Sequence, residues 1–342
     1  MGALVLLVEL IFGAWLIPAN QLNFFGVSSN MDEYIEVSNL TGPPVVIHHT
    51  RDRHGLRGQS TFNQPEKIDI LTIGGSTTFQ QDIDDADTWQ EHLEAKLKSA
   101  GKMLTISNAG INGHSTHAHI KAFDTWFSTI EGLQPRYILF YIGVNDYLPR
   151  PFLLGENVKT NRLKSTLQDK SAIYNALRRA KGAYLASKND FDSDIIDFSK
   201  YEFTEESLLT EAYREFYLNE FVPAFKTRLQ KLIALSQAMG AEPVFITQPM
   251  AFYRYQNGAL VGVSNAGHDF VSKQPVSGSD THELITYLNE AMHEVALGYK
   301  VVDLTDLQVW SPTDFRDWIH NSSTGTEKVA HEIWKQLGDY LK

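Results

Sequence analysis

A serine stands directly after an apolar, strand-like segment of the chain. In the stretch ILTIGGSTTFQ, residues 70–80, two glycines separate the apolar run from Ser76. A tight turn would explain the glycines, because glycine adopts backbone angles that other residues resist. A nucleophile at the end of a strand would explain the serine as well. A serine hydroxyl reacts poorly at neutral pH, so this second interpretation requires a base within hydrogen-bond reach and a group that orients the base.

A candidate base and its orienting group lie near the C-terminus, in FRDWIHNSSTG. Asp317 and His320 are three residues apart, and we expect a helical turn to place both side chains on one face. The carboxylate would hold one ring nitrogen and fix the tautomer, so that the other nitrogen faces Ser76. The alternative for Asp317 is a helix cap.

Two loops contain candidate donors for the oxyanion of a tetrahedral intermediate. SNAGING contains Gly110, whose backbone N–H has no side chain in its way, and YIGVNDY contains Asn145, whose amide is a donor. Together with the N–H of Ser76 they would form a three-donor oxyanion hole. Asn145 as a simple turn cap is the alternative, and Asp146 is expected to hold the loop rather than to react.

Alternating strand-like and helix-like segments would position these residues. The alternation predicts a parallel sheet covered by helices on both faces and joined by right-handed crossovers. Ligands bind beyond the carboxyl ends of the strands in such sheets, and Ser76 lies beyond the end of the first strand. The five predicted strands are Ile68–Ile73, Met103–Ile106, Tyr137–Ile142, Val244–Thr247 and Lys300–Asp303.

Four sequence blocks, GGST, NAGING, GVND and DWIH, occur in the order found in the SGNH, or GDSL-type, hydrolases. The resemblance covers about residues 67–342. The resemblance implies a flavodoxin-like three-layer sandwich with a five-stranded parallel sheet, and ester hydrolysis through an acyl-serine. The nucleophile block reads GGST in place of the commoner Gly-Asp-Ser, which resembles a bacterial, membrane-anchored subgroup of less defined substrate. The blocks are GGST with Ser76, NAGING with Gly110, GVND with Gly143 and Asn145, and DWIH with Asp317 and His320.

The family also implies a role for each of these residues. Ser76 would be both nucleophile and oxyanion donor. His320 would be the base, and Asp317 would orient it. Gly110 and Asn145 would be the other oxyanion donors. No cofactor or metal is implied.

Residues 1–25 form an apolar segment in which Glu9 is the one charged residue. The apolar run is short for a membrane-spanning helix, and the first basic residue is Arg51. One interpretation is the outer part of a membrane anchor, with the remainder extracytoplasmic, in the periplasm or at the cell surface. The other is an amphipathic helix docked on the domain.

Two further segments lie outside the strand and helix alternation. Residues 26–66 are interpreted as a lead-in segment that crosses the surface. Its Arg51, His54 and Arg57 would either reach the rim of the site to bind an acidic group or simply lie at the surface. A cap-like insert at about 153–220 interrupts the hydrolase domain, residues 67–342. The first part of the insert is rich in Lys and Arg, which indicates a solvated helix face or contact with an anionic lipid or glycan.

Composition and failed motifs exclude several functional classes. A net charge of −11 argues against a nucleic-acid partner, and the absence of cysteine excludes thiolate catalysis and cysteine-ligated zinc. The stretch HSTHAH favours a polar helix start over a metal site made by His114, His117 and His119. The stretch DIDDAD lacks the calcium-loop pattern and is interpreted as a solvated loop.

The residues therefore predict a membrane-tethered serine esterase acting on an acyl, or O-acetyl, ester. Its substrate would be a cell-surface glycan or a lipid. An exported location and a polar lead-in favour the glycan, whereas Met250, Phe252 and Tyr253 would line an acyl pocket and favour the lipid. Acyl transfer through the same acyl-serine and a non-catalytic envelope assembly module are the two alternative functions.

Overall fold

The computed structural model describes residues 9, 27, 29–39, 42–150, 171, 173–174 and 196–342. The chain divides into two compact units, one of residues 1–28 and 157–194 and one of residues 29–156 and 195–342. In the first unit, Glu9 accepts hydrogen bonds from Ser171 Oγ at 2.6 Å and from Ile173 N at 3.1 Å. The helices and strands below all belong to the second unit.

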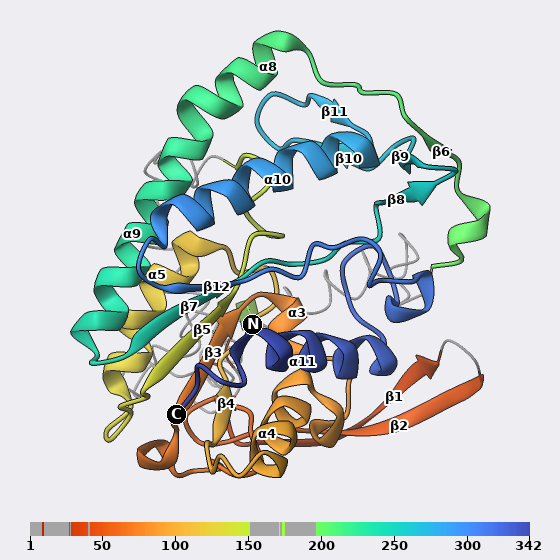
Figure 1. The fold of residues 1–342 in the computed structure, drawn as a ribbon. Coiled ribbons are helices and arrows are strands. Elements are labelled where there is room, and N and C mark those ends of the chain that lie inside the picture. The colour runs from red at the N-terminus through yellow and green to blue at the C-terminus, as the bar shows by residue number, and fades with distance from the viewer. Residues whose placement is uncertain are drawn as a thin grey trace. The chain divides into compact units, whose positions relative to one another are not determined.

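A five-stranded parallel sheet forms the centre of the second unit (Figure 1), in the order β12-β7-β5-β3-β4. The three strands β3, β4 and β5 are buried along their whole length, which explains the largely apolar sequences of β3 and β5. The predicted parallel sheet is confirmed. The strands are β3 Ile70–Gly74, β4 Ile106–Asn108, β5 Tyr137–Tyr141, β7 Glu242–Ile246 and β12 Lys300–Val302.

The second strand lies later in the chain than the sequence predicts and shares only Ile106 with the predicted range Met103–Ile106. Met103 was expected to begin it, but Met103 is 74% exposed and the strand starts at Ile106. The residues before Ile106 instead form a loop that crosses from α4 to the sheet, with the Thr105 N–H bonded to the Asp69 carboxylate.

Helices cover both faces of the sheet, which completes the predicted three-layer sandwich. Helices α4 and α11 pack together on one face, and α5, α9 and α10 pack together on the other (Figure 1). The long helices are α4 Trp89–Ser99, α5 Thr116–Thr125, α9 Val222–Ala238, α10 Gly278–Val295 and α11 Ser323–Leu337.

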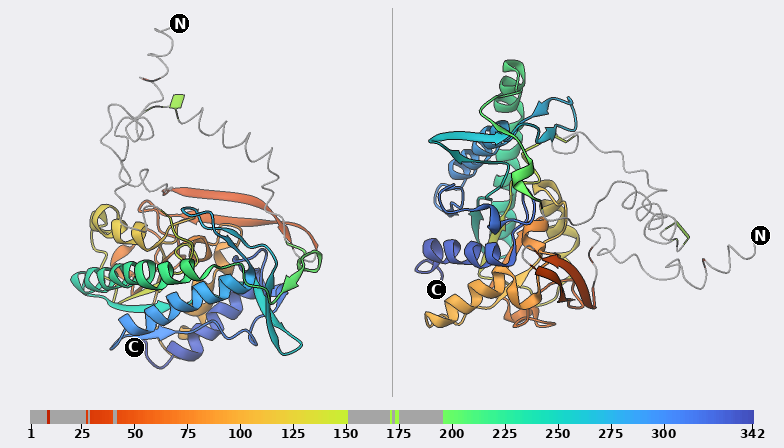
Figure 2. Two further views of the ribbon diagram at one scale, coloured as in Figure 1. Left: turned by 90° about the horizontal axis from the view of Figure 1, so that it is seen from above. Right: turned by 90° about the vertical axis from the view of Figure 1, so that its right-hand side faces the viewer.

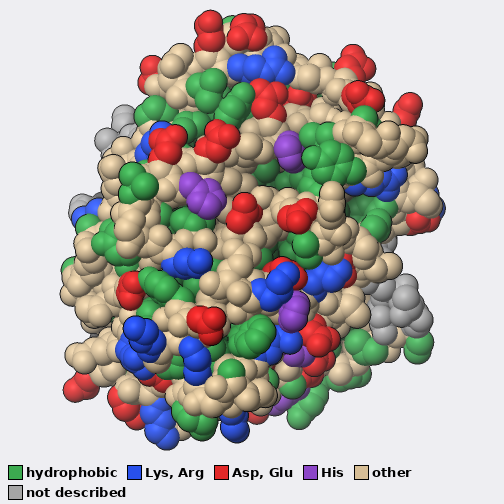
Figure 3. Space-filling model, viewed as in Figure 1, with side chains coloured by type: hydrophobic (Ala, Val, Ile, Leu, Met, Phe, Trp, Pro, Cys, Tyr) green, Lys and Arg blue, Asp and Glu red, His purple; other side chains and the backbone are tan. Residues whose placement is uncertain are grey.

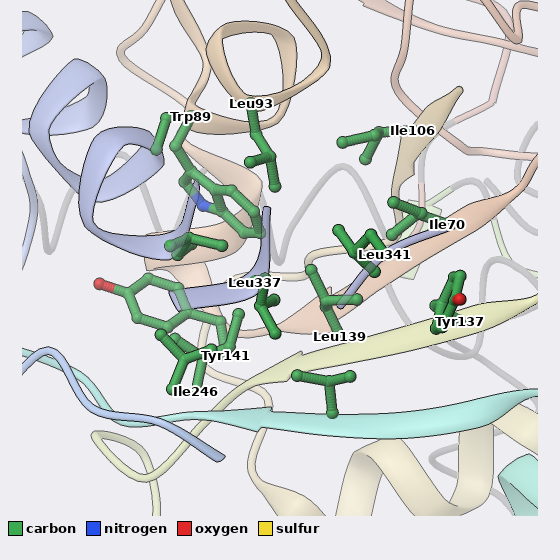
Figure 4. Packing of buried hydrophobic residues seen from close by; sticks show 14 of the residues in the cluster. Ile70, Trp89, Leu93, Ile106, Tyr137, Leu139, Tyr141, Ile246, Leu337 and Leu341 are labelled. Carbon is green, nitrogen blue, oxygen red and sulfur yellow. The ribbon is translucent and has the colours of Figure 1, made fainter. Parts of the chain in front are cut away.

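Buried apolar side chains of α4, α11 and the sheet form a core cluster. Trp89, Leu93 and Leu97 repeat along α4 and are fully buried in this cluster. Figure 4 shows Trp89 and Leu93 above the strands. Each such side chain stabilises the fold by about 1.5–3 kcal/mol relative to an exposed one. This packing holds the strands whose carboxyl ends lie next to the candidate site.

Smaller elements surround this sandwich. The short helices are α3 Ser76–Phe79 and α8 Glu211–Phe216, with a π-helical turn η6 Tyr217–Phe221 that joins α8 to α9. Three-residue 3₁₀ turns are η1 Pro65–Lys67, η2 Asp85–Asp87, η3 Phe127–Thr129, η5 Phe198–Lys200 and η7 Pro312–Asp314. Antiparallel strands are β6 Phe203–Thr204, β8 Tyr253–Gln256 and β9 Ala259–Val263 in one sheet, and β10 Gly267–His268 with β11 Pro275–Val276 in another.

The lead-in segment forms a long hairpin that the sequence did not predict. Strands β1 Met31–Asn39 and β2 Gly42–Arg51 pair antiparallel and extend along the outside of the second unit (Figure 2). Ile47 is buried on one face of the hairpin, whereas Tyr34 and Val46 are exposed on the other. Because apolar residues occupy both faces, the alternation that marks a half-buried strand is hidden.

The expected insert at about 153–220 is described at residues 171 and 173–174 and from residue 196 onward. The part from residue 196 begins with η5 and β6, followed by α8 and η6, and it lies in the second unit with the sandwich. The rest of the Lys- and Arg-rich first part, and residues 1–25 except Glu9, lie outside the described residues. In the described part of the chain, none of the helices has the length and apolar character needed to cross a membrane.

Candidate active site

Ser76 is the first residue of α3, directly after β3 and the cap residue Gly75. Close approach explains both preceding glycines. A Cβ on Gly74 would lie 2.0 Å from Thr78 Oγ1 and 2.4 Å from Tyr141 O, and a Cβ on Gly75 would lie 2.2 Å from Asn145 Nδ2. Neither glycine has a positive φ. The glycines are therefore needed for space more than for a special backbone angle.

Ser76, His320 and Asp317 form a continuous chain of hydrogen bonds. Ser76 Oγ lies 2.7 Å from His320 Nε2, and Asp317 Oδ2 lies 2.6 Å from His320 Nδ1. The serine follows β3, the strand between β5 and β4, and the other two residues lie in the loop after β12, where His320 is 244 residues from Ser76 in the chain. The structure thus brings together the three residues that the sequence singled out.

Asp317 and His320 are not held by a helical turn, contrary to our expectation. Residues 315–320 form a bent loop. The side chains of Asp317 and His320 still meet across three residues, because Asp317 Oδ1 accepts the backbone N–H groups of Ile319 and His320, each at 2.8 Å. An aspartate that bonds the backbone two and three residues ahead folds the chain locally and needs no helix.

The electrostatics of this pair favour an ionised Asp317. Burial opposes the charge and raises the pKa of Asp317, but the hydrogen bond and charge of His320 and the two N–H groups outweigh it, so the pKa is lowered overall. An ionised carboxylate accepts the proton on Nδ1, which leaves Nε2 as an acceptor for the Ser76 hydroxyl. The arrangement suits removal of the serine proton.

The amide of Asn145 is one of the expected oxyanion donors, and the structure places it beside the nucleophile. Its Nδ2 packs against the Cα of Gly75 and donates one hydrogen bond to His114 O at 2.9 Å. An amide nitrogen has two hydrogens, so a second one remains for a ligand. The N–H of Ser76 belongs to the first turn of α3, where helix N–H groups have no intrahelical partner.

Gly110 differs from the expectation. Its N–H donates to Asn108 Oδ1 at 2.8 Å, so the loop uses this donor to form its own turn. Its Cα packs on α3, where a Cβ would lie 2.3 Å from Phe79 N. In this structure Gly110 allows the loop to approach α3, and its N–H is used within the loop. The oxyanion roles of Gly110, Ser76 and Asn145 stay predictions.

Polar side chains from several elements hold α3 in place. A helix of four residues is not stable by itself and leaves its last carbonyl groups without partners. Thr78 O accepts Asn108 Nδ2 at 2.6 Å and Gln90 Nε2 at 3.1 Å. Arg57 Nη1 donates to the carbonyl oxygens of Phe79 and Gln80, each at 2.8 Å.

Arg51 and Arg57 of the lead-in segment are buried, so both of the roles predicted for these two arginines are wrong. Arg57 is paired with Asp85 at 2.5 Å in addition to its bonds to α3. Arg51 donates to Gly110 O at 2.7 Å, and its guanidinium lies 4.2 Å from the centre of the Phe79 ring. Burial, reinforced by the charge of Arg57, lowers the pKa of Arg51 to about 9. His54 is half-buried, and its ring accepts a hydrogen bond from Arg53.

Asp146 holds a loop, as the sequence predicts. Its carboxylate accepts the N–H of Thr116 at 3.0 Å and the Thr116 hydroxyl at 2.5 Å, at the start of α5. Burial raises the pKa of Asp146, with the nearby Arg228 acting in the opposite direction. This carboxylate binds the 143–146 loop to α5.

The acidic stretch DIDDAD and the histidine-rich stretch HSTHAH both have structural contacts. Within the described ranges, no group of three histidine, cysteine or carboxylate residues could hold a metal ion, and His119 of HSTHAH is buried. The DIDDAD loop is not simply solvated, as we had expected. Asp84 and Asp85 accept backbone N–H groups of β2, from His48 at 2.7 Å and from Thr50 at 2.9 Å, and so attach the hairpin to η2.

An apolar pocket lies next to the loop that carries Asp317 and His320. Met250 and Tyr253 line this pocket, whereas Phe252 is not among its lining residues and stacks on Trp318 with ring centres 5.1 Å apart. Trp318 follows Asp317 in sequence, so the aromatic packing also supports the catalytic loop. The remaining lining residues are Phe198, Phe203, Ala251, Arg254, Leu307, Trp310, Ser311, Pro312 and Phe315.

Sequence reasoning missed several residues that support the site. Gln248 is 2% exposed and bonds both Thr77 and Val144. Its position after the fourth predicted strand, at the same sheet edge as Ser76, could have pointed to it. Arg57 offered no such pattern, because an arginine in a polar stretch is normally exposed.

Comparison with known proteins gives one match to a protein family. Residues 70–333 match the model described as GDSL-like Lipase/Acylhydrolase. No match is found among curated proteins.

Several solved structures are similar to the chain at low sequence identity. They include TesA (12% identity, 80% of this chain and 99% of that chain, TM-score 0.43) and the acetyl xylan esterase AlAXEase (14%, 78% and 98%, 0.40). A third is the psychrotrophic esterase EstA from Pseudoalteromonas sp. (12%, 80% and 97%, 0.42).

Proposed function

The chain belongs to the GDSL-like lipase/acylhydrolase family and is an ester hydrolase, and we propose that it acts through an acyl-serine formed on Ser76. The observation that carries this proposal is the hydrogen-bonded chain from Ser76 through His320 to Asp317. Serine hydrolases require this order of nucleophile, base and orienting carboxylate.

The proposed reaction has two halves. In the first, His320 Nε2 takes the Ser76 proton as Oγ attacks the ester carbonyl, and the oxyanion is stabilised by the Ser76 N–H and the Asn145 amide. The C–O bond to the alcohol then breaks, and His320 returns the proton to the leaving alkoxide. In the second half, His320 takes a proton from water, the resulting hydroxide attacks the acyl-serine, and the acid leaves as Ser76 regains its proton.

The proposed substrate is an acyl ester, including an O-acetyl ester, of a cell-surface glycan or a lipid. The apolar pocket lined by Met250 and Tyr253 supports a bound acyl chain. The apolar residues 1–25 and the Lys- and Arg-rich first part of the insert support an extracytoplasmic enzyme that contacts a membrane.

Hydrolysis of nitrophenyl esters of increasing chain length, measured beside acetylated sugars, tests the substrate class. A lipid substrate predicts that kcat/KM rises with chain length and that Met250→Trp, which fills the pocket, removes this rise while acetate turnover persists. Preference for acetate and for acetylated sugars would instead support the glycan. Release of free acid distinguishes hydrolysis from transfer to a sugar.

If the parent protein hydrolyses none of these esters, the proposal is contradicted.

A further inference from the structure

One buried amide connects the segment of the nucleophile to the segment of the oxyanion donor. Gln248 lies two residues after β7 and is 2% exposed. Its Nε2 donates to Thr77 Oγ1 at 2.6 Å, and its Oε1 accepts the Val144 N–H at 2.7 Å. Thr77 follows Ser76 in the chain, and Val144 precedes Asn145.

The orientation of this amide is fixed by its partners. A backbone N–H can only donate, so the Gln248 atom that faces Val144 must be the oxygen and the atom that faces Thr77 the nitrogen. The neighbouring Gly143 has a φ of +127°, a conformation that glycine tolerates, and this turn directs the Val144 N–H inward. Without the amide, the buried Val144 N–H would have to find another partner, which would move the 143–146 loop.

Other side chains hold α3 but do not reach that loop. Gln90, Asn108 and Arg57 bind the carbonyl groups of residues 78–80. Among the described side chains that bind α3, Gln248 is the one that also binds the 143–146 loop. The spacing between the Ser76 N–H and the Asn145 amide therefore depends on Gln248 more directly than on these other contacts.

We infer that Gln248 is a positioning residue of the oxyanion hole, which holds Asn145 at a fixed place relative to Ser76. The inference rests on the proposed function, because it takes Ser76 as the nucleophile and Asn145 as a donor. Donors stabilise a developing oxyanion when they are held in place before the reaction, so loosening one of them lowers kcat more than substrate binding.

Replacement of Gln248 by methionine tests this role, because methionine has a similar length and volume but makes neither hydrogen bond. We expect kcat for nitrophenyl acetate to fall about 30-fold or more, with KM within about threefold of the parent value. The matched control is Gln336→Met. Gln336 bonds both the N–H and the carbonyl of Asp303, outside the site. We expect its kcat to stay within about twofold.

A double-mutant cycle with Asn145→Ala separates positioning from a general structural effect. If Gln248 acts through Asn145, Gln248→Met should slow the Asn145→Ala enzyme by no more than about threefold. If the two fold-reductions in kcat multiply in the double variant, the inference is overturned.

Thr77→Val removes only the hydrogen bond between Gln248 and α3, and valine keeps the shape of the threonine side chain. It should lower kcat about fivefold or more, and it serves as the test if Gln248→Met does not fold.

The outcomes distinguish this inference from the proposed function. Parent-like turnover by Ser76→Ala would overturn both. Loss of turnover in Ser76→Ala together with a parent-like kcat in both Gln248→Met and Thr77→Val would overturn only the role of Gln248.

Discussion

Asp317 makes three hydrogen bonds with different purposes. Two backbone N–H groups, from Ile319 and His320, fold the loop, and the third bond orients the His320 ring. The same three bonds lower the pKa of Asp317 despite its burial. One carboxylate therefore contributes both to the local fold and to the chemistry.

This double role predicts the behaviour of Asp317→Asn. We expect kcat to fall by about 10²–10⁴, with measurable residual turnover from the oxyanion donors and substrate binding. The control is the far-UV circular dichroism spectrum, which should be unchanged. Parent-like kcat in a folded Asp317→Asn protein would contradict the role of Asp317.

The lowered pKa of Asp317 also predicts a pH dependence of stability. Because the folded state holds this proton more weakly than the unfolded state, the stabilisation is present above the ordinary aspartate pKa and is lost as pH falls through the lowered value. The free energy of unfolding of the parent, measured in urea between pH 6 and pH 3, should thus fall more steeply than that of Asp317→Asn. Parallel curves would contradict the pKa assignment.

Gly75 predicts a change in activity without a large change in stability. An added Cβ would lie 2.2 Å from Asn145 Nδ2, the end of a movable side chain. Gly75→Ala should therefore displace the amide and lower kcat about tenfold or more, while the melting temperature changes little. An unchanged kcat would show that the Asn145 amide is not needed where the structure places it.

At the scale of the elements, the proposed nucleophile Ser76 lies on a helix too short to be stable alone. Polar side chains from the lead-in segment, α4, the end of β4 and the loop after β7 hold this helix. The Arg57 support is a buried ion pair with Asp85, in which the side chains are 2% and 4% exposed. Solvent screening is therefore weak, and loss of one partner leaves a buried charge.

Arg57→Ala should lower the free energy of unfolding by about 3–5 kcal/mol, because it leaves Asp85 buried without its cation. Urea unfolding followed by tryptophan fluorescence measures this. The double variant Arg57→Ala/Asp85→Ala should recover part of the loss. A loss below about 1 kcal/mol, typical of a surface pair, would contradict the buried arrangement.

The elements also show what the sequence could predict. Strands β3 and β5 could be found because they are largely apolar runs, whereas β4, Ile106–Asn108, was misplaced because two of its three residues are polar. The site could be found because Ser76, Asn145 and His320 follow predicted strands whose carboxyl ends lie on one side of the sheet. The N–H of Gly110 could not be assigned, because its partner depends on the side-chain rotamer of Asn108. The burial of Arg57 could not be seen either, because it depends on tertiary contacts that leave no local pattern.

At the scale of the whole molecule, charge is distributed unevenly. On the face in Figure 3, acidic side chains gather at the top, where α8 and the segment before it lie. This agrees with the exposed glutamates of residues 202–220, whereas the Lys- and Arg-rich stretch belongs to the other unit. Although the net charge is −11, the segment 157–194 is rich in Lys and Arg, and it belongs to the same unit as residues 1–28.

This division predicts binding to membranes through the first unit. The full chain should co-sediment with vesicles that contain anionic lipid and bind neutral vesicles more weakly. A variant that starts at Ser29, where the second unit begins, should lose most of this binding and keep its turnover of nitrophenyl acetate. Equal vesicle binding by the two proteins would contradict a membrane role for the N-terminal segment.

The central claim is that Ser76 is the nucleophile, and covalent labelling tests it most directly. A nitrophenyl phosphonate should add one phosphonyl group to the peptide that contains Ser76, seen by mass spectrometry, and esterase activity should fall in proportion to the labelled fraction. Ser76→Ala should remain unlabelled and inactive. Labelling at another residue, or turnover by Ser76→Ala at the parent rate, would contradict the account.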